Sequence, residues 1–274
     1  MGPAGLAVAA DPVVVIVAAI AFGVAIGLAI GALGGGGSVI AVPILVYVLG
    51  QDVHEATTAS LVVVTAGAVA GGLGHAREGN VCWRHAGAFA AAALPGVVAG
   101  TVLGDVVGAS TLLVAFAFVM LVAAAATWWK VGMDADAVAP HPACPPLRLG
   151  RNLLAGLTVG VMTGFFGVGG GFLVVPTLAI FLALTMRLAV GTSLAIITAT
   201  SVMGLVAHLL VGRGLDLEVT GAMAAACVAG ALAGSALAAR LPERRLGRGF
   251  ASLVTVLAIY LLVSAAFFGG PPAP

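Results

Sequence analysis

Gly34-Gly35-Gly36-Gly37-Ser38-Val39-Ile40-Ala41-Val42-Pro43 is a stretch that this chain contains twice, and the second copy is Gly167-Val168-Gly169-Gly170-Gly171-Phe172-Leu173-Val174-Val175-Pro176. The two glycine motifs are 133 residues apart, and each lies between long apolar segments. At the same offset Ser60 matches Ser193 and His75 matches His208. Because serine, histidine and proline matches are rare by chance in a chain rich in glycine and alanine, the sequence predicts two structural repeats.

The composition indicates that the solvent of this protein is lipid. Of its 274 residues 62% are hydrophobic and 8% are charged, whereas a soluble domain has about 25% charged residues. This small number of charged residues cannot cover a water-facing surface. We therefore predict an all-α membrane protein that is surrounded by membrane lipid. The net charge of +1 and the lack of a basic stripe argue against a nucleic-acid partner.

Apolar runs without Asp, Glu, Lys or Arg mark the predicted membrane segments. They cover 13–33, 38–50, 56–75, 86–104 and 111–129 in the first half, and 152–166, 172–186, 190–211, 219–239 and 249–268 in the second. A spanning helix needs about 20 residues, and the segment after each glycine motif is shorter. We therefore expect about ten membrane segments, including short helices after glycine-rich breaks.

The basic residues indicate how these segments cross. If all ten cross, ten of the 11 basic residues lie on one side and only Arg213 lies on the other. If the two short segments are re-entrant, the division is six against five. Since the positive-inside rule favours the first arrangement, we expect both termini to be periplasmic and a cytoplasmic linker at 130–150. An odd number of crossings per repeat inverts the second repeat (151–268) relative to the first (13–129).

Two kinds of glycine pattern point to two roles. Glycines recur every fourth residue at Gly23, Gly27 and Gly31, and again at Gly156, Gly160 and Gly164, which is typical of close helix packing in membranes. The consecutive glycines of the motifs should instead break the helix, and backbone freed in this way must be buried or line a cavity. Proline fits the first turn of a helix, so Pro43 and Pro176 predict short helices that begin near Ala41 and Val174.

Glycine-interrupted segments at equivalent places in two halves are typical of the binding site of a transporter, and helix N-termini attract anions. The segments contain no basic side chain, so a bound anion would need several backbone and hydroxyl donors. Packing alone is the alternative role for the motif glycines, and the hydroxyls at 57–60 and 192–193 could instead cap the third segment of each half. The predicted substrate-binding residues are Gly36, Gly37, Ser38, Val39, Ser60, Gly169, Gly170, Gly171, Phe172, Thr192 and Ser193.

His75 and His208 close the third segment of each half. They fit either the membrane interface or a proton-linked gate, because histidine titrates near neutral pH, and the inversion places them at opposite faces. The segments offer no catalytic set of polar residues, so an enzyme is not expected. Cys82, Cys144 and Cys227 have no metal-site or disulfide spacing, so we expect neither a disulfide nor a metal, and no cofactor.

At these residues the chain resembles the sulfite exporter TauE/SafE family of membrane permeases. The resemblance rests on the two glycine motifs, the stretches 56–61 and 189–194, and the paired histidines, and it covers about Val13 to Phe268. It implies a bacterial inner-membrane transporter of small sulfur-containing anions such as sulfite or organosulfonates, acting by alternating access. The alternatives are a non-transporting accessory or assembly protein and a membrane enzyme. Transport direction, coupling ion and homo-oligomerisation stay open.

Overall fold

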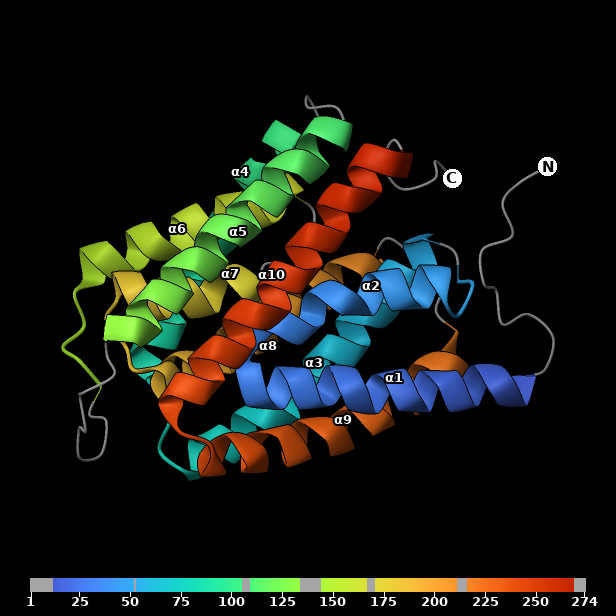
Figure 1. The fold of residues 1–274 in the computed structure, drawn as a ribbon, viewed down its shortest axis with the longest axis horizontal. Coiled ribbons are helices and arrows are strands. Elements are labelled where there is room, and N and C mark those ends of the chain that lie inside the picture. The colour runs from blue at the N-terminus through green and yellow to red at the C-terminus, as the bar shows by residue number, and fades with distance from the viewer. Residues whose placement is uncertain are drawn as a thin grey trace.

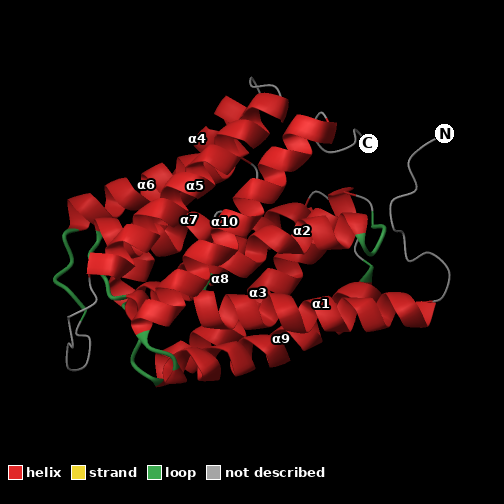
Figure 2. Cartoon of the chain, viewed as in Figure 1, coloured by secondary structure: helices red, strands yellow, loops and turns green. Residues whose placement is uncertain are grey.

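The computed structural model describes residues 12–51, 53–104, 109–133, 144–166, 171–210 and 216–268. These residues form ten α-helices and two short helical segments of other types, and the described part of the chain contains no strand (Figure 2). The all-α prediction is therefore confirmed.

The helices follow the predicted order of segments. The first half contains α1 (Pro12–Leu33), the 3-10 helix η1 (Gly35–Gly37), α2 (Ser38–Tyr47), α3 (Val53–Arg77), α4 (Trp83–Gly104) and α5 (Ala109–Met133). The second contains α6 (Leu149–Phe166), α7 (Gly171–Pro176), the π-helical η3 (Thr177–Phe181), α8 (Met186–Leu210), α9 (Leu217–Arg240) and α10 (Glu243–Phe268). Eight of these helices are long and apolar enough to cross a membrane, and the segments Gly35–Val46 and Gly171–Phe181 are shorter. The prediction of long segments with a short one after each glycine motif is confirmed.

Helices from opposite halves pack in close pairs, α1 against α9 and α4 against α6. A Cβ atom at Gly27 or Gly31 would overlap the main chain of α9. A Cβ atom at Gly160 or Gly164 would overlap the main chain of α4 in the same way. The glycines at spacing four therefore act in packing, as predicted, because they let helix backbones come into direct contact.

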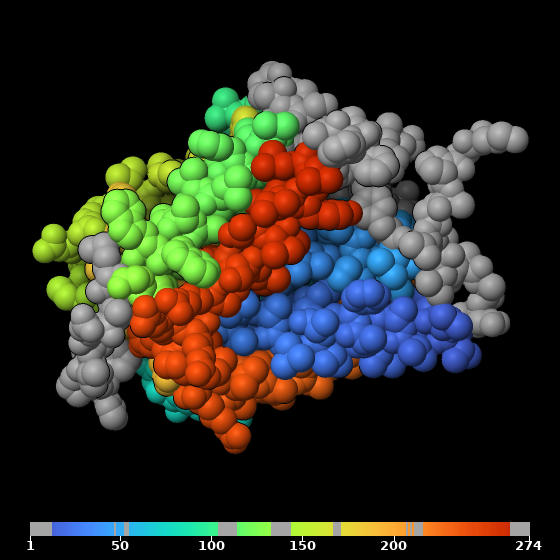
Figure 3. All heavy atoms as spheres, viewed as in Figure 1, coloured from blue at the N-terminus to red at the C-terminus, as the bar shows by residue number. Residues whose placement is uncertain are grey.

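Two further pairs complete the bundle. α5 packs along α10, and Figure 3 shows these two helices side by side on one face of the molecule, with α1 below them. α3 packs on α8, and these are the most buried of the eight long helices. Apolar side chains remain exposed on the outside, as expected of a surface in contact with lipid: Val98, Val102, Phe118, Val256 and Tyr260.

The equivalent helices α3 and α8 run antiparallel. Near the start of α3, Thr58 shares a hydrogen bond with His208 near the end of α8. At the other end of the pair, a Cβ atom on Gly191 of α8 would lie 3.1 Å from Cβ of His75. An inverted repeat requires this arrangement for its equivalent helices, and the inversion of the two complete halves stays a prediction.

One end of the bundle carries the basic residues. The side-chain amide of Asn152 donates to the carbonyl of His85, and Arg187 donates to the carbonyl of Leu241. The first bond joins the start of α6 to the start of α4, and the second joins the start of α8 to the end of α9. The contact of Arg248 with the ring of Trp128 adds the start of α10 and the end of α5. The basic residues on these helix ends and on the end of α3 are Arg77, Arg84, Lys130, Arg148, Arg151, Arg187, Arg240, Arg244, Arg245 and Arg248.

In Figure 1 the start of α1 and the end of α10 lie on the right, and the end of α5 and the start of α6 lie on the left. Arg213 lies outside the described residues. The clustering of the other basic residues agrees with the ten-to-one division that the sequence predicts. The assignment of this end to the cytoplasm stays a prediction from the positive-inside rule.

The expected starts of the two short helices are wrong. α2 begins at Ser38 and α7 at Gly171, three residues before the predicted starts at Ala41 and Val174. η1 runs directly into α2, so Pro43 lies inside that helix. Pro176 is the last residue of α7, and the chain continues from it as the π-helical η3. A proline has no N–H to give to the carbonyl four residues earlier, and a π-helical turn is one way in which a helix absorbs that loss.

Candidate functional site

The first glycine motif breaks the helix at a single residue. α1 ends at Leu33, and Gly34 has φ 79° and ψ −128°, a conformation that favours glycine. Its amide still donates to the carbonyl of Ile30 over 2.8 Å, so the chain leaves α1 abruptly and enters η1. The predicted break is confirmed in this copy. Residues 167–170 of the second copy, with Gly169 and Gly170, lie outside the described residues.

The two motifs meet at Gly35 and Gly171. A Cβ atom at Gly35 would overlap the carbonyl group of Gly171, and one at Gly171 would lie 3.1 Å from Cα of Gly35 and 2.9 Å from Oγ of Ser38. The two backbones are therefore in direct contact, with no side chain between them. Stretches that are 133 residues apart in the sequence come together here, and the predicted role of these residues in binding an anion stays a prediction.

The remaining motif residues are buried around this contact. Gly36 faces the end of the Leu253 side chain, which a Cβ atom would approach to 3.0 Å, and Gly37 faces α1 at Ile26 and Ile30. Val39 is part of the apolar core. Of the motif residues that we expect in the site, Gly36 and Gly37 therefore offer only backbone groups, and Val39 packs in the core.

Phe172 differs from the other motif residues because it carries a large side chain. Its ring packs edge-on against Phe116 of α5, with ring centres 5.1 Å apart and an interplanar angle of 84°. Phe116 also contacts Phe166, the last residue of α6, at 5.2 Å. The aromatic cluster of Phe116, Phe166 and Phe172 therefore joins α5 both to the residue just before the second motif and to Phe172 within it.

Three serines of the candidate site each donate to a backbone carbonyl. Ser38 donates to Gly35 over 2.7 Å, Ser193 to Val190 over 2.7 Å and Ser60 to Thr57 over 2.8 Å. Ser193 is fully buried, and a Cβ atom at Gly34 would lie 2.6 Å from its hydroxyl. Ser38 and Ser193 thus reach the place where the two motifs meet, and each must rotate its O–H away from a carbonyl to donate to an anion.

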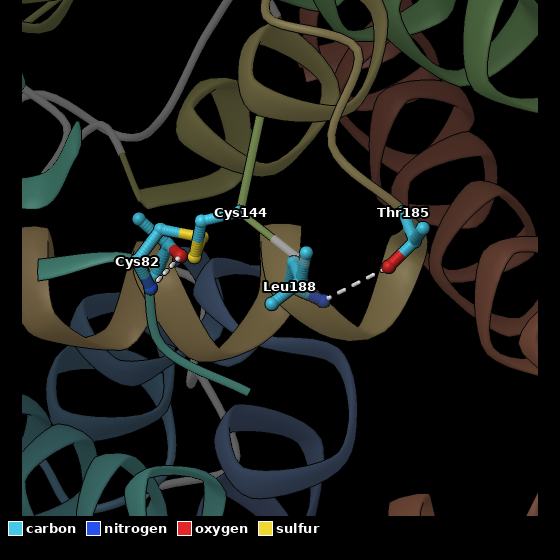
Figure 4. Close-up of a disulfide and its surroundings, with 5 residues drawn as sticks. Cys82, Cys144, Thr185 and Leu188 are labelled. Atoms are coloured by element: carbon cyan, nitrogen blue, oxygen red, sulfur yellow. Dashed lines mark hydrogen bonds between the residues drawn. A yellow bond between two sulfur atoms is a disulfide. The ribbon is translucent and has the colours of Figure 1, made fainter. Parts of the chain in front are cut away.

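The hydroxyls do not cap the third segments, so that alternative is wrong. α3 begins at Val53 and α8 at Met186, which places residues 57–60 and 192–193 beyond the first turn. The cap of α8 comes instead from Thr185, whose hydroxyl accepts from the amide of Leu188 over 3.5 Å (Figure 4).

Thr192 has a partner in the loop between α3 and α4. Its hydroxyl accepts from the amide of Cys82 over 3.0 Å, and its side chain is fully buried. Next to it, a Cβ atom on Gly191 would overlap the carbonyl oxygen of Asn80. The loop therefore packs directly on the first turns of α8, beside Ser193.

The two histidines lie at opposite ends of the α3–α8 pair, as the inversion predicts. His75 is only 1% exposed, and its Nε2–H donates to the carbonyl of Gly31 over 2.9 Å. The ring of His75 joins the end of α3 to the last turn of α1 just before the first motif, and its role at the membrane interface or in a gate stays a prediction. Nδ1 of His208 and the hydroxyl of Thr58 are 3.1 Å apart.

The cysteines correct another expectation. Cys82 and Cys144 form a disulfide across a separation of 62 residues, a distance at which sequence spacing gives no signal, while Cys227 is free and buried. Within the described residues no group of three His, Cys, Asp or Glu side chains could hold a metal ion.

The comparisons with known proteins can now be set beside this geometry. The model of the family described as "Sulfite exporter TauE/SafE" matches residues 19–261. The chain belongs to the sulfite exporter TauE/SafE family. This membership agrees with the two glycine motifs and with the multi-pass helical fold, and no solved structure matches the chain.

Relatives of this TauE/SafE family member are named as probable membrane transporters. A "Probable membrane transporter protein" from Xylella fastidiosa strain 9a5c is 33% identical over 245 residues, covering 86% of this chain and 91% of the relative. One from strain Temecula1 is 34% identical over 246 residues, with the same coverage. The "Probable membrane transporter protein YunE" of Bacillus subtilis is 32% identical over 105 residues, covering 38% of this chain and 36% of the relative. The protein is a membrane transporter and not an enzyme.

Several contacts at the site could not be predicted. The sequence marked His75 through its match with His208, but nothing in it indicated the Gly31 carbonyl as the partner. It marked Thr192 as a hydroxyl, but not the amide of Cys82 that binds it. These partners are far away in the sequence, and only the packing of α1 against α3 and of the α3–α4 loop against α8 brings them together.

Proposed function

We propose that this transporter carries small sulfur-containing oxyanions, such as sulfite or organosulfonates, out of the bacterial cell by alternating access. The observation that carries the proposal is the direct contact of the two motifs at Gly35 and Gly171, with Ser38 and Ser193 beside it. The family description names sulfite export, which supports the choice of substrate class and of direction.

The chemistry of this place suits an anion without a fixed countercharge. The apolar segments around it contain no Lys or Arg, so the donors are backbone N–H groups and hydroxyls. Hydrogen bonds to a charged group contribute about 1.5–3 kcal/mol each, and several are needed to replace water around an oxyanion. Glycines let an anion approach the backbone closely, which is the advantage that we assign to Gly35, Gly36 and Gly171 in addition to packing.

The contact between the motifs also suggests how access changes. Gly35 and Gly171 touch backbone to backbone, which leaves no room for an anion between these two residues. Substrate therefore enters when the two short segments separate. α1 with α9 and α4 with α6 form two close-packed pairs from opposite halves, and we propose that these pairs move as units around α3 and α8. His75 and His208, at opposite ends of α3 and α8, are the proposed proton-linked gates.

Flux of labelled sulfite into proteoliposomes tests the proposal. Ser193→Ala removes the buried hydroxyl beside Gly34 of the first motif, and we expect about ten- to a hundred-fold weaker binding, since about 1.4 kcal/mol corresponds to ten-fold. The matched control is Ser235→Ala, because Ser235 is also buried and donates to the carbonyl three residues earlier, but lies in α9. The control should retain wild-type affinity.

A second arm separates transport from an accessory role. Purified protein alone should move sulfite or a small sulfonate, and a pH gradient should change the rate if the histidines couple it to protons. Cells lacking the protein should accumulate sulfite. Purified protein without flux of either anion, together with normal sulfite levels in those cells, would support an accessory protein whose glycines serve packing only.

A further inference from the structure

We propose that Cys82 and Cys144 form a reversible thiol–disulfide modification site on the cytoplasmic face, and that its redox state controls the loop that contacts Thr192. The disulfide joins residue 144 of the linker before α6 to the loop between α3 and α4. Figure 4 shows the disulfide beside the first turns of α8, near Thr185 and Leu188. The disulfide itself is not among the predicted anion-binding residues, although the loop that it holds contacts Thr192, which is one of them. The proposal does not depend on the identity of the transported substrate.

The location of the disulfide argues against a purely structural role on chemical grounds. Residues 82 and 144 lie at the end of the bundle that carries ten basic residues. Cys82 is two residues before Arg84 at the start of α4, and Cys144 is four residues before Arg148, which precedes α6. The positive-inside rule places that end in the cytoplasm. Cytoplasmic thiols are kept reduced, and disulfides found there are usually transient and catalytic or redox-sensing.

The environment of the disulfide allows a small thiol to react with one defined sulfur. Cys144 is exposed, whereas Cys82 is 2% exposed. A cavity of about 300 Å³ lies beside the bond and is lined by residues 81–85 of the loop and 144–147 of the linker. Arg84 is one of the residues that line this cavity, and a positive charge nearby favours an incoming thiolate or a carboxylate-bearing thiol such as glutathione.

The reaction follows ordinary thiol–disulfide exchange. The thiolate of a small thiol attacks Sγ of Cys144, the S–S bond breaks, and the electron pair leaves with Sγ of Cys82, which takes up a proton. A second small thiolate then attacks the sulfur of the first small thiol in the mixed disulfide. The thiolate of Cys144 leaves and takes up a proton. Two small thiols are oxidised to one disulfide, and the protein gains two electrons and two protons. Formation of the protein disulfide is the reverse and consumes an oxidised small disulfide.

The consequence for the protein follows from the contacts of Cys82. Its amide donates to the Thr192 hydroxyl over 3.0 Å, and Thr192 precedes Ser193 in α8. While the disulfide is intact, the linker at 144–148 is tied to this loop and limits its motion. Reduction removes that tie, so the amide of Cys82 should leave Thr192 more often.

Side-selective labelling tests the modification site. Free thiols are first blocked with N-ethylmaleimide, the membranes are treated with glutathione, and a membrane-impermeant polyethylene glycol maleimide then marks the cysteines released. In inside-out vesicles we expect two tags after glutathione and none before it, and in intact spheroplasts none in either case. Cys227→Ala should give the same pattern, while Cys82→Ser and Cys144→Ser should each leave one thiol that is already free.

The result can overturn the proposal in three ways. No tag after either glutathione or dithiothreitol, in membranes treated with an oxidised thiol before the N-ethylmaleimide block, would mean that the pair does not form. Tags in spheroplasts would place the bond on the oxidising side, and a bond in inside-out vesicles that resists glutathione would be structural.

Hydrogen exchange of the purified protein tests the coupling to Thr192. Reduction should speed exchange in the peptide over residues 78–86 by about ten-fold or more, while a peptide over residues 114–126 of α5 should not change. Equal exchange at 78–86 in both redox states would overturn the control of the loop, whatever the labelling shows.

Discussion

The two glycine motifs occupy equivalent places in the sequence, but their surroundings differ. The first motif is small and polar, with the Ser38 hydroxyl on the Gly35 carbonyl and a single positive-φ residue at Gly34. The described part of the second motif is apolar and aromatic, with Phe172 and Phe166 packed on Phe116. The residue equivalent to Ser38 is Gly171, which lies so close to Ser38 that a side chain there would meet its hydroxyl.

This difference indicates that the two motifs have different roles. The rings fix the second motif to α5, whereas the first motif keeps an adjustable hydroxyl at the contact. The Ser38 side chain fits at the contact between the motifs because the equivalent residue of the second motif, Gly171, has no side chain. The two halves therefore differ where they meet, and a substrate site there is asymmetric even if the repeats are related by inversion.

The strongest test of the comparison is Gly35→Ala. Its Cβ atom would overlap the carbonyl group of Gly171, and neither backbone can move without displacing a helix. Overpacking usually costs about 1–3 kcal/mol and sometimes more. Because both partners here are backbone, we expect this variant to lose more stability than any other variant below, with a loss of monodisperse protein after purification. In Gly36→Ala the new methyl group meets side chains and no backbone, the end of Leu253 at 3.0 Å and the Phe250 ring at 3.8 Å. Equal yields and equal melting temperatures for the two variants would show that the backbone contact is not required.

Phe172→Ala should have the next largest effect. Removing a buried aromatic side chain costs about 3–5 kcal/mol, and here it also removes the edge-on contact with Phe116. The equivalent first-motif change, Val39→Ala, removes a smaller side chain and should lower the melting temperature less. If both variants melt at the same temperature, the aromatic cluster does not anchor the second motif.

Exchanging the residues at the equivalent positions 38 and 171 tests the asymmetry itself. Ser38→Gly should fold normally, because a hydrogen bond such as the one from Ser38 to the Gly35 carbonyl is worth about 0.6 kcal/mol on average in a membrane protein. Gly171→Ser should be more destabilising, since its Cβ would lie 3.0 Å from Cδ1 of Ile197 and 3.1 Å from Cα of Gly35. Thermal melting in detergent measures both. Similar stability of the two variants would mean that the positions are interchangeable.

The smallest effects are expected at the histidines. His75→Gln can keep a donor for the Gly31 carbonyl and should lower stability by less than about 1 kcal/mol, within the range measured for such bonds in membranes. His75→Ala leaves that carbonyl unpaired and should cost more. His208→Gln should change stability least, because His208 is less buried than His75. Flux measured against pH adds the functional test: a gate at His75 predicts a flatter pH profile for His75→Gln, and an unchanged profile argues against it.

Much of the fold could be predicted from the sequence because lipid imposes simple rules on it. Apolar length fixed the long helices, the short segments after the motifs were recognisable, and the glycines at spacing four marked the tight helix pairs. Basic residues such as Arg77, Arg84 and Arg187 predicted the end of the bundle at which they lie. These properties are local, or add up along the chain, so no contact map is needed to find them.

The tertiary structure decided which residues are in contact and where the short helices begin. Pro43 and Pro176 pointed to helix starts that are wrong, because η1 continues directly into α2 and a π-helical turn follows α7. The hydroxyls at 57–60 lie inside a helix rather than at its cap, and Cys82 and Cys144 are bonded although their spacing gave no sign of it. The sequence by itself determined the membrane class, the two repeats and the place of the motifs, because hydrophobic length and glycine spacing act locally. Only the packing of distant helices decided that Gly35 meets Gly171 and that Cys82 binds Thr192, because such contacts depend on how the whole bundle closes.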